Sequence, residues 1–89
     1  MLRKRMTYKI PMQPENSFRV TLDLERPKER LDYILIDTLK QQNENETLSR
    51  ISKAQLKRLF SEKKVLIKGQ NAKAKSPINS GITYIDILL

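Results

Sequence analysis

The 89-residue sequence predicts a single α+β domain in which two helices pack on a small, mostly antiparallel sheet of four or five strands. Three observations predict this class. Residues 17–25 alternate apolar and polar side chains, residues 28–42 repeat apolar side chains at helical spacing, and a capped basic helix from Ser52 runs into a short strand that ends at Gly69. A chain of this length supports one small core, so we expect one domain over residues 17–89.

The first strand and the first helix are defined by the spacing of their apolar residues. Every second residue of 17–25 is apolar, which is typical of a half-buried strand; the inner-face residues are Phe18, Val20, Leu22 and Leu24. Pro27 suits the first turn of a helix, where its missing N–H needs no partner. The repeat that predicts a helix over 28–42 consists of Leu31, Ile34, Leu35, Thr38 and Leu39. The polar tract KQQNENET at 40–47 predicts a loop.

The second helix begins with a capping box. Ser52 can accept a hydrogen bond from the backbone N–H of Gln55, whose side chain reaches back to the backbone of Ser52. At 100° per residue, three lysines fall within about 40° of one another, namely Lys53, Lys57 and Lys64. The apolar residues of the adjoining arc are Leu56, Leu59 and Phe60. The pattern therefore predicts a helix with one apolar side and a neighbouring stripe of lysines.

The C-terminal third predicts two more strands joined by irregular chain. Residues 65–68 form a short strand, and Gly69 to Asn71 supply residues that tolerate the positive φ of a tight turn. An irregular edge and a second turn at Gly81 follow. The last strand, 82–89, is expected to point Ile85 and Ile87 inward and Asp86 outward.

The net charge of +8 is concentrated at the two ends of the chain. Residues 1–14 hold four basic residues and no acidic one, and residues 47–89 hold nine basic and two acidic residues. We expect residues 1–16 to form a flexible basic arm. The asymmetry indicates a polyanionic partner, although charge alone does not separate RNA, DNA and anionic lipid.

Several classes of function are excluded by missing residue types. The chain has no cysteine and no histidine, which removes the usual zinc and iron ligand sets and nucleophile–histidine catalysis. Two glycines are too few for a phosphate-binding loop, and the carboxylates are scattered over separate elements. We therefore expect no enzyme activity, no cofactor and no small-molecule substrate. No apolar run is long enough to span a bilayer, so we expect a cytoplasmic protein without a membrane partner.

The lysines of the second helix are the leading candidates for a binding site. A single surface lysine is usually only solvated, but three lysines share one edge without an intervening acid. The charge continues into the sheet through Lys68, Lys73 and Lys75. Stacking of bases on Tyr8, Tyr33 or Tyr84 is the weaker hypothesis, since packing or chance exposure also explains each. The pattern favours recognition of the phosphate backbone and shape of a structured RNA.

The sequence resembles the RNA-binding domain named after small-subunit ribosomal protein S-four, also called the alpha-L motif. The family pattern has R-L-D, S-R-S, L-I, G-R-V and V-N-G followed by a late glycine. The corresponding residues are Arg30-Leu31-Asp32, Ser52-Lys53-Ala54, Leu59-Phe60, Lys63-Lys64-Val65, Ile67-Lys68-Gly69 and Gly81. The preceding strand is similar to the N-terminal domain of large-ribosomal-RNA pseudouridine synthases. Departures are a lysine for the turn glycine, a longer loop between the helices, and no aspartate after Gly81.

The resemblance implies binding of ribosomal or transfer RNA by a monomer. Together with the charge pattern, it gives the candidate RNA-binding residues Arg30, Ser52, Lys53, Lys57, Lys64, Lys68 and Lys73. A salt bridge with Asp32 or Glu29 equally explains Arg30, and helix capping explains Ser52. Two other functions stay open: the RNA-recognition part of a pseudouridine synthase whose catalytic aspartate lies in a second domain, and a protein adaptor or DNA-binding accessory.

Overall fold

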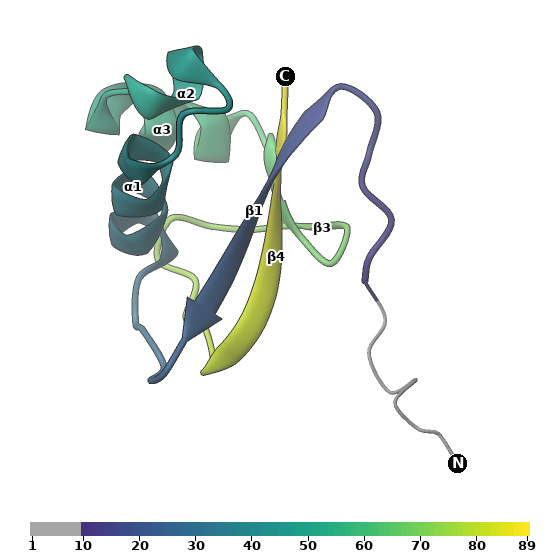
Figure 1. The fold of residues 1–89 in the computed structure, drawn as a ribbon, viewed down its shortest axis with the longest axis vertical. Coiled ribbons are helices and arrows are strands. Elements are labelled where there is room, and N and C mark those ends of the chain that lie inside the picture. Colours follow the sequence, from purple (N-terminus) through teal and green to yellow (C-terminus); the bar gives the residue numbers. More distant parts are fainter. Residues whose placement is uncertain (1–9) are drawn as a thin grey trace.

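The computed structural model describes residues 10–89 and has the predicted α+β class. Three helices lie together on one side of a four-stranded antiparallel sheet with the order β1-β4-β2-β3 (Figure 1). The elements are β1 (Ser17–Leu24), α1 (Leu31–Gln41), α2 (Glu46–Ser49), α3 (Lys53–Ser61), β2 (Val65–Ile67), β3 (Gln70–Asn71) and β4 (Gly81–Leu88). Within residues 10–89, no helix has the length and apolar character of a membrane span.

The first and last strands form the longest pair of the sheet. β1 and β4 pair along their whole lengths, from Ser17 opposite Leu88 to Leu24 opposite Gly81. The other edge of β4 pairs with β2, so β4 is a central strand. Most strand pairing therefore joins residues that are far apart in the sequence.

The core lies between the sheet and the helices. The alternation predicted for the first strand is confirmed in its centre, because Val20 and Leu22 are buried. The inward orientation predicted for Ile85 and Ile87 is also confirmed, since both are fully buried. The helical residues that complete this core are Leu31, Leu35, Ile36, Leu39, Leu48, Leu56 and Phe60.

The first helix begins later than its spacing predicts, at Leu31 instead of residue 28. Lys28 is paired instead with Ile78, and each backbone N–H donates to the other residue's carbonyl over 2.8 Å. The first two amides of α1, those of Leu31 and Asp32, donate to the carbonyls of Ser76 and Ala74. Acceptors from a distant segment thus satisfy amides that a helix start leaves without partners.

The tract predicted as a loop at 40–47 contains the start of a short helix, α2. Asn45 caps it by accepting a hydrogen bond from the Leu48 backbone over 3.0 Å. Leu48 is buried in the core, and this burial stabilises the short helix although the surrounding sequence is polar. The longer connection between the two main helices is therefore partly folded.

The second main helix, α3, ends at Ser61, so the predicted third lysine of its stripe lies outside it. The N–H of Lys64 donates to Leu59 over 2.9 Å and that of Lys63 to Phe60 over 3.1 Å, the two hydrogen bonds of a Schellman motif. Lys63 has φ of 62°, the left-handed conformation that this motif requires. Because the chain leaves the helical conformation at this turn, the spacing of 100° per residue does not place Lys64 on the same face as Lys53 and Lys57.

Residues 65–71 form a hairpin: the strand predicted over 65–68 ends at Ile67, and Gln70 and Asn71 of the predicted turn pair with it. Lys68 and Gly69, with φ of 54° and 79°, are the two loop residues between β2 and β3. Positive φ at both positions is the signature of a type I′ turn. Residues 1–9 of the predicted arm, including Tyr8 and the arm's four basic residues, lie outside the described residues.

Candidate nucleic-acid interface

A groove lies where the start of α1, the first half of α3 and the segment around Lys75 meet. It encloses about 240 Å³, and we call it the basic groove. Its apolar lining consists of Ile36, Leu56 and Ala74, and its polar and aromatic lining of Arg30, Asp32, Tyr33, Lys53, Lys57 and Lys75. Four basic side chains from three segments therefore surround an apolar floor.

The capping box of α3 places two of these lysines. The Ser52 hydroxyl accepts from the Gln55 N–H over 3.1 Å, and the Ser52 N–H donates to the Gln55 side chain over 2.9 Å. The helix consequently starts at Lys53, and Lys57 follows four residues later on the same face. The capping role predicted as the alternative for Ser52 is the one observed.

Arg30 makes the salt bridge that the sequence offered as the alternative to an RNA contact. Its Nε and Nη2 donate to the two carboxylate oxygens of Asp32 over 3.1 and 2.7 Å. These hydrogen bonds raise the pKa of Arg30 above its ordinary value. The guanidinium also lies 4.3 Å from the ring centroid of Tyr33. We call Arg30, Asp32 and Tyr33 the groove cluster.

The structure brings together only part of the predicted site. Arg30, Lys53 and Lys57 line the basic groove, with Lys75 beside them. The remaining predicted lysines, Lys64, Lys68 and Lys73, do not line it. The predicted three-lysine stripe is therefore wrong in its last member.

Each of the other three lysines has its own surroundings. Lys64 follows the end of α3, and its Nζ lies 3.4 Å from a Glu62 carboxylate oxygen. Lys68, in the hairpin loop, lines a separate hollow that also includes Tyr84. Lys73 is exposed, and its backbone N–H donates to the Ser76 hydroxyl over 2.9 Å. None of these contacts directs the side chain into the basic groove.

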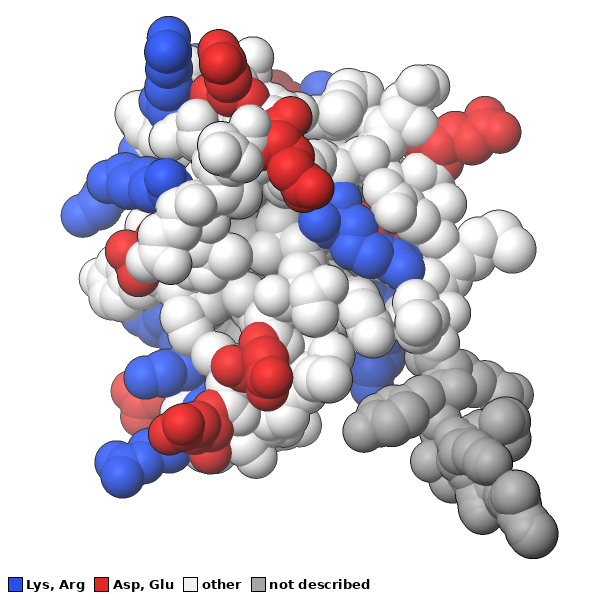
Figure 2. Space-filling model, viewed as in Figure 1, with Lys and Arg blue, Asp and Glu red and all other residues white. Residues whose placement is uncertain are grey.

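A wider depression adjoins the basic groove along α1. It shares Arg30, Tyr33, Ile36 and Lys53 with the groove, and it adds the basic residues Lys28 and Lys40. Two carboxylates, those of Glu29 and Asp37, also line it. Figure 2 shows basic side chains along the margin where the helices lie, with acidic side chains between them. The lysines of the groove thus belong to a broader surface of mixed but mainly positive charge.

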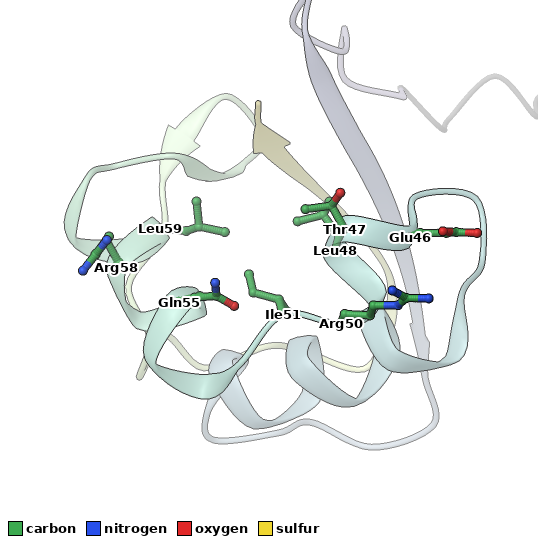
Figure 3. A pocket seen from close by; sticks show the side chains of 8 residues that line it. All are labelled: Glu46, Thr47, Leu48, Arg50, Ile51, Gln55, Arg58 and Leu59. Atoms are coloured by element: carbon green, nitrogen blue, oxygen red, sulfur yellow. The ribbon is translucent and has the colours of Figure 1, made fainter.

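A second pocket lies on the opposite side of α3 (Figure 3). It encloses about 560 Å³ between α2 and α3, and no residue of the basic groove lines it. Its lining consists of Glu46, Thr47, Leu48, Arg50, Ile51, Gln55, Arg58 and Leu59. Arg50 and Arg58 are therefore cations on neighbouring elements but outside the groove, which makes them useful controls.

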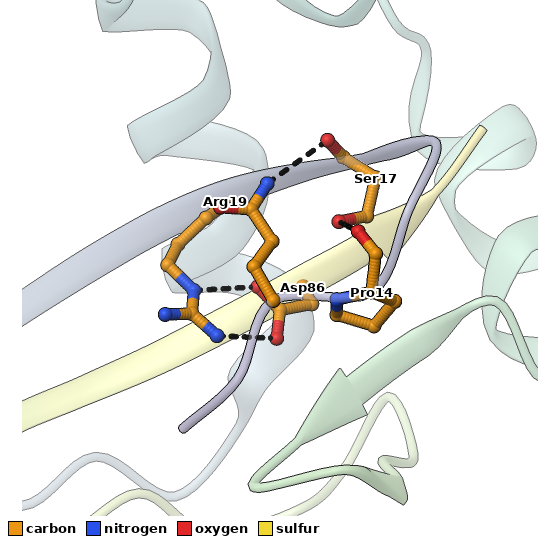
Figure 4. Close-up of polar contacts among 5 residues, drawn as sticks. Pro14, Ser17, Arg19 and Asp86 are labelled. Atoms are coloured by element: carbon orange, nitrogen blue, oxygen red, sulfur yellow. Dashed lines mark hydrogen bonds and ion pairs between the residues drawn. The ribbon is translucent and has the colours of Figure 1, made fainter. Parts of the chain in front are cut away.

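A second arginine–aspartate pair lies on the sheet face that points away from the helices (Figure 4). The Nε and Nη2 of Arg19 donate to the carboxylate oxygens of Asp86 over 2.7 and 2.9 Å, and these hydrogen bonds raise the pKa of Arg19. Arg19 also lies 5.3 Å from the ring centroid of Tyr84. The outward orientation predicted for Asp86 is correct, but its side chain is only 1% exposed. We call Arg19, Asp86 and Tyr84 the sheet cluster.

Comparison with known proteins adds no identification. No protein-family model, no curated protein and no solved structure matches the chain.

Proposed function

We propose that the chain binds structured RNA, of the ribosomal or transfer RNA class, through the basic groove. The observation that carries this proposal is the convergence of Lys53, Lys57 and Lys75 on one groove. In the described part of the chain, no ion pair involves any of the three. Neighbouring cations without acidic partners favour an anion between them, and a nucleic acid supplies a row of phosphates.

The apolar and aromatic lining of the groove favours RNA, with its exposed bases, over a partner that offers phosphates alone. A flat lysine surface would serve any phosphate backbone, whereas this groove has an apolar floor and the exposed ring of Tyr33 at its edge. Sequence-specific RNA recognition uses unpaired bases that stack on such side chains. The groove therefore combines features that suit the folded, partly unpaired structure of RNA.

The turns of the chain support the further proposal that this is an alpha-L domain of the ribosomal protein S-four type. The resemblance places glycine, asparagine and glycine where this chain has Lys63, Lys68 and Gly81. All three have positive φ, at 62°, 54° and 96°. Glycine and asparagine are the residues that adopt this conformation most readily. The backbone thus bends where the family residues would suit it, even where the chain carries lysine.

A titration of structured RNA with paired charge reversals tests the proposal. We expect wild-type protein to bind a ribosomal RNA stem-loop or a transfer RNA, with about four phosphate contacts and a logarithmic salt slope of about −3 to −4. The variant Lys53→Glu/Lys57→Glu should bind about tenfold more weakly or worse, and its slope should be shallower by about 2. Fluorescence anisotropy at several salt concentrations measures both quantities.

Arg50→Glu/Arg58→Glu is the matched control, because it makes the same change of charge on the other side of α3. Its weaker binding should disappear near physiological salt, where charges more than about 8 Å from the RNA are screened. Equal losses in the two variants would show that net charge, not the groove, governs binding. Equal affinity for duplex DNA would assign the groove to nucleic acids in general. Absence of RNA binding at low salt would contradict the proposed function.

A further inference from the structure

Tyr33 is an aromatic residue on the surface at the edge of the basic groove. The residue is 59% exposed, and it is the one aromatic among the exposed large hydrophobic residues of 10–89. An exposed tyrosine in isolation is ordinary. This one lies beside lysines that have no acidic partner within residues 10–89, on the groove that we propose for RNA.

Tyr33 contacts both other members of the groove cluster, Arg30 through its ring and Asp32 through its backbone. The Arg30 guanidinium is fixed by two hydrogen bonds to Asp32 and lies 4.3 Å from the ring centroid. The Asp32 carboxylate also accepts a hydrogen bond from the Tyr33 backbone over 2.9 Å. An arginine engaged in this way is poorly suited to bind a phosphate, because its charge is already matched. Its position is instead suited to supporting one side of the aromatic ring.

The groove next to this ring has the composition of a nucleotide site. Of its lining residues, Ile36 and Leu56 are buried and Ala74 is half-buried, whereas the lysines of α3 are exposed. The enclosed space, about 240 Å³, is smaller than the roughly 300–1,000 Å³ of pockets for drug-sized ligands. A single planar base has apolar faces that suit such a floor, and its flanking phosphates suit the lysines.

We infer that the basic groove takes one unpaired nucleotide of a structured RNA, with its base stacked on Tyr33 and its flanking phosphates on Lys53 and Lys57. This inference rests on the proposed function and makes it more specific. A fully paired helix keeps its bases stacked inside and offers the groove phosphates alone. Arg30 is then a positioning residue that holds the stacking surface, in place of the phosphate contact expected from the sequence.

Three hairpin RNAs test this inference: one fully paired, one with a single bulged adenosine, and one with an abasic nucleotide at the bulge. We expect wild-type protein to bind the bulged adenosine about tenfold more tightly than the other two, because one base stacked on an aromatic ring contributes that much or more. Tyr33→Leu should lose this preference, so that it binds the bulged adenosine no more tightly than the other two hairpins. Tyr33→Phe should keep it, since the ring face is retained.

Tyr84→Leu is the matched control, because Tyr84 also stacks with an arginine but lies in the sheet cluster. We expect it to retain the preference for the bulge. Thermal unfolding by circular dichroism checks that each variant is folded, and Tyr33 is exposed enough for its replacement to leave the core intact.

The outcomes separate the two proposals. Equal wild-type affinity for all three hairpins would overturn the single-nucleotide inference and leave the proposed function standing. Equal affinity for the adenosine and abasic bulges would also overturn it, since the bend of the RNA would then be what is recognised. A preference that persists in folded Tyr33→Leu would show that the base does not stack on this ring. Absence of binding to all three would overturn the proposed function together with the inference.

Discussion

The groove cluster and the sheet cluster use the same three residue types in different surroundings. Each consists of an arginine that donates two hydrogen bonds to an aspartate and stacks on a tyrosine. In the sheet cluster, the arginine and aspartate side chains are 15% and 1% exposed. In the groove cluster, the corresponding values are 36% and 21%. The same chemistry is therefore nearly buried in one place and open to solvent in the other.

The two clusters also differ in what they connect. Arg19 and Asp86 are opposite each other in the pairing of β1 with β4, so their ion pair joins the two ends of the described chain across the sheet. Arg30 and Asp32 are only two residues apart at the start of α1. Their ion pair is therefore local and connects no distant parts of the chain.

This difference indicates different roles. A buried pair is strongly destabilising to break, because one charge is left without its partner away from water. An exposed local pair contributes little to stability. The exposed fractions of the two pairs indicate a structural role for the sheet cluster, and they are consistent with the ligand-binding role that we propose for the groove cluster. Two changes, one in each cluster, test this assignment, beginning with the larger expected effect.

Asp86→Ala should destabilise the protein by about 3 kcal/mol, because it leaves the Arg19 guanidinium without its partner on the sheet. Equilibrium unfolding in urea measures this loss. Arg19→Met/Asp86→Leu should recover most of it, since apolar side chains replace both members of a buried pair with little loss. An Asp86→Ala variant as stable as the wild type would show that the sheet cluster is not structural and would remove the contrast between the clusters.

Much of this contrast lies beyond what the sequence predicts. The alternation in β1 and the capping box at Ser52 are local signals, and both elements appear where those signals place them. The burial of Asp86 is not local, because its partner Arg19 comes from the other end of the chain. Alternation alone assigns Asp86 to the outer face and cannot show that an arginine covers it there.

The candidate site was predictable to the same extent. Helical spacing places Lys53 and Lys57 on one face, but it fails for Lys64 because the helix ends in a left-handed turn first. The family pattern that the sequence resembles has a glycine at the position of Lys63. That glycine was the available signal that the helix ends before Lys64. Lys75 reaches the groove through a segment tied to α1 by backbone hydrogen bonds, for which the sequence carries no local sign.

Asp32→Asn should separate phosphate contact from base stacking in the RNA binding that we propose for the groove. Removing this carboxylate frees the Arg30 charge for a phosphate, so affinity for the fully paired hairpin should rise about two- to threefold and the salt slope should steepen by nearly 1. The preference for the bulged adenosine should fall, because the guanidinium is no longer held against Tyr33. Anisotropy titrations of both hairpins measure the two effects.

Asp37→Asn provides the matched control for this change. It adds the same charge on the same helix, in the depression beside the groove, but it leaves the groove cluster intact. Both hairpins should then bind slightly more tightly with no change in their ratio. An Asp32→Asn variant that behaves in the same way would show that the groove cluster does not support Tyr33.

Lys63→Gly should stabilise the protein and leave RNA binding near physiological salt unchanged, so that stability and binding are separated at a third position. Lys63 has φ of 62° at the end of α3 and lines none of the pockets described above. A side chain in this conformation costs about 1–2 kcal/mol, and the greater freedom of glycine in the unfolded chain offsets about half of the gain. The net stabilisation should be about 0.5–1 kcal/mol, measured by urea unfolding. Lys63→Ala removes the same charge but keeps the Cβ atom, so it should show no such gain; weaker RNA binding by both variants would instead place Lys63 at the interface.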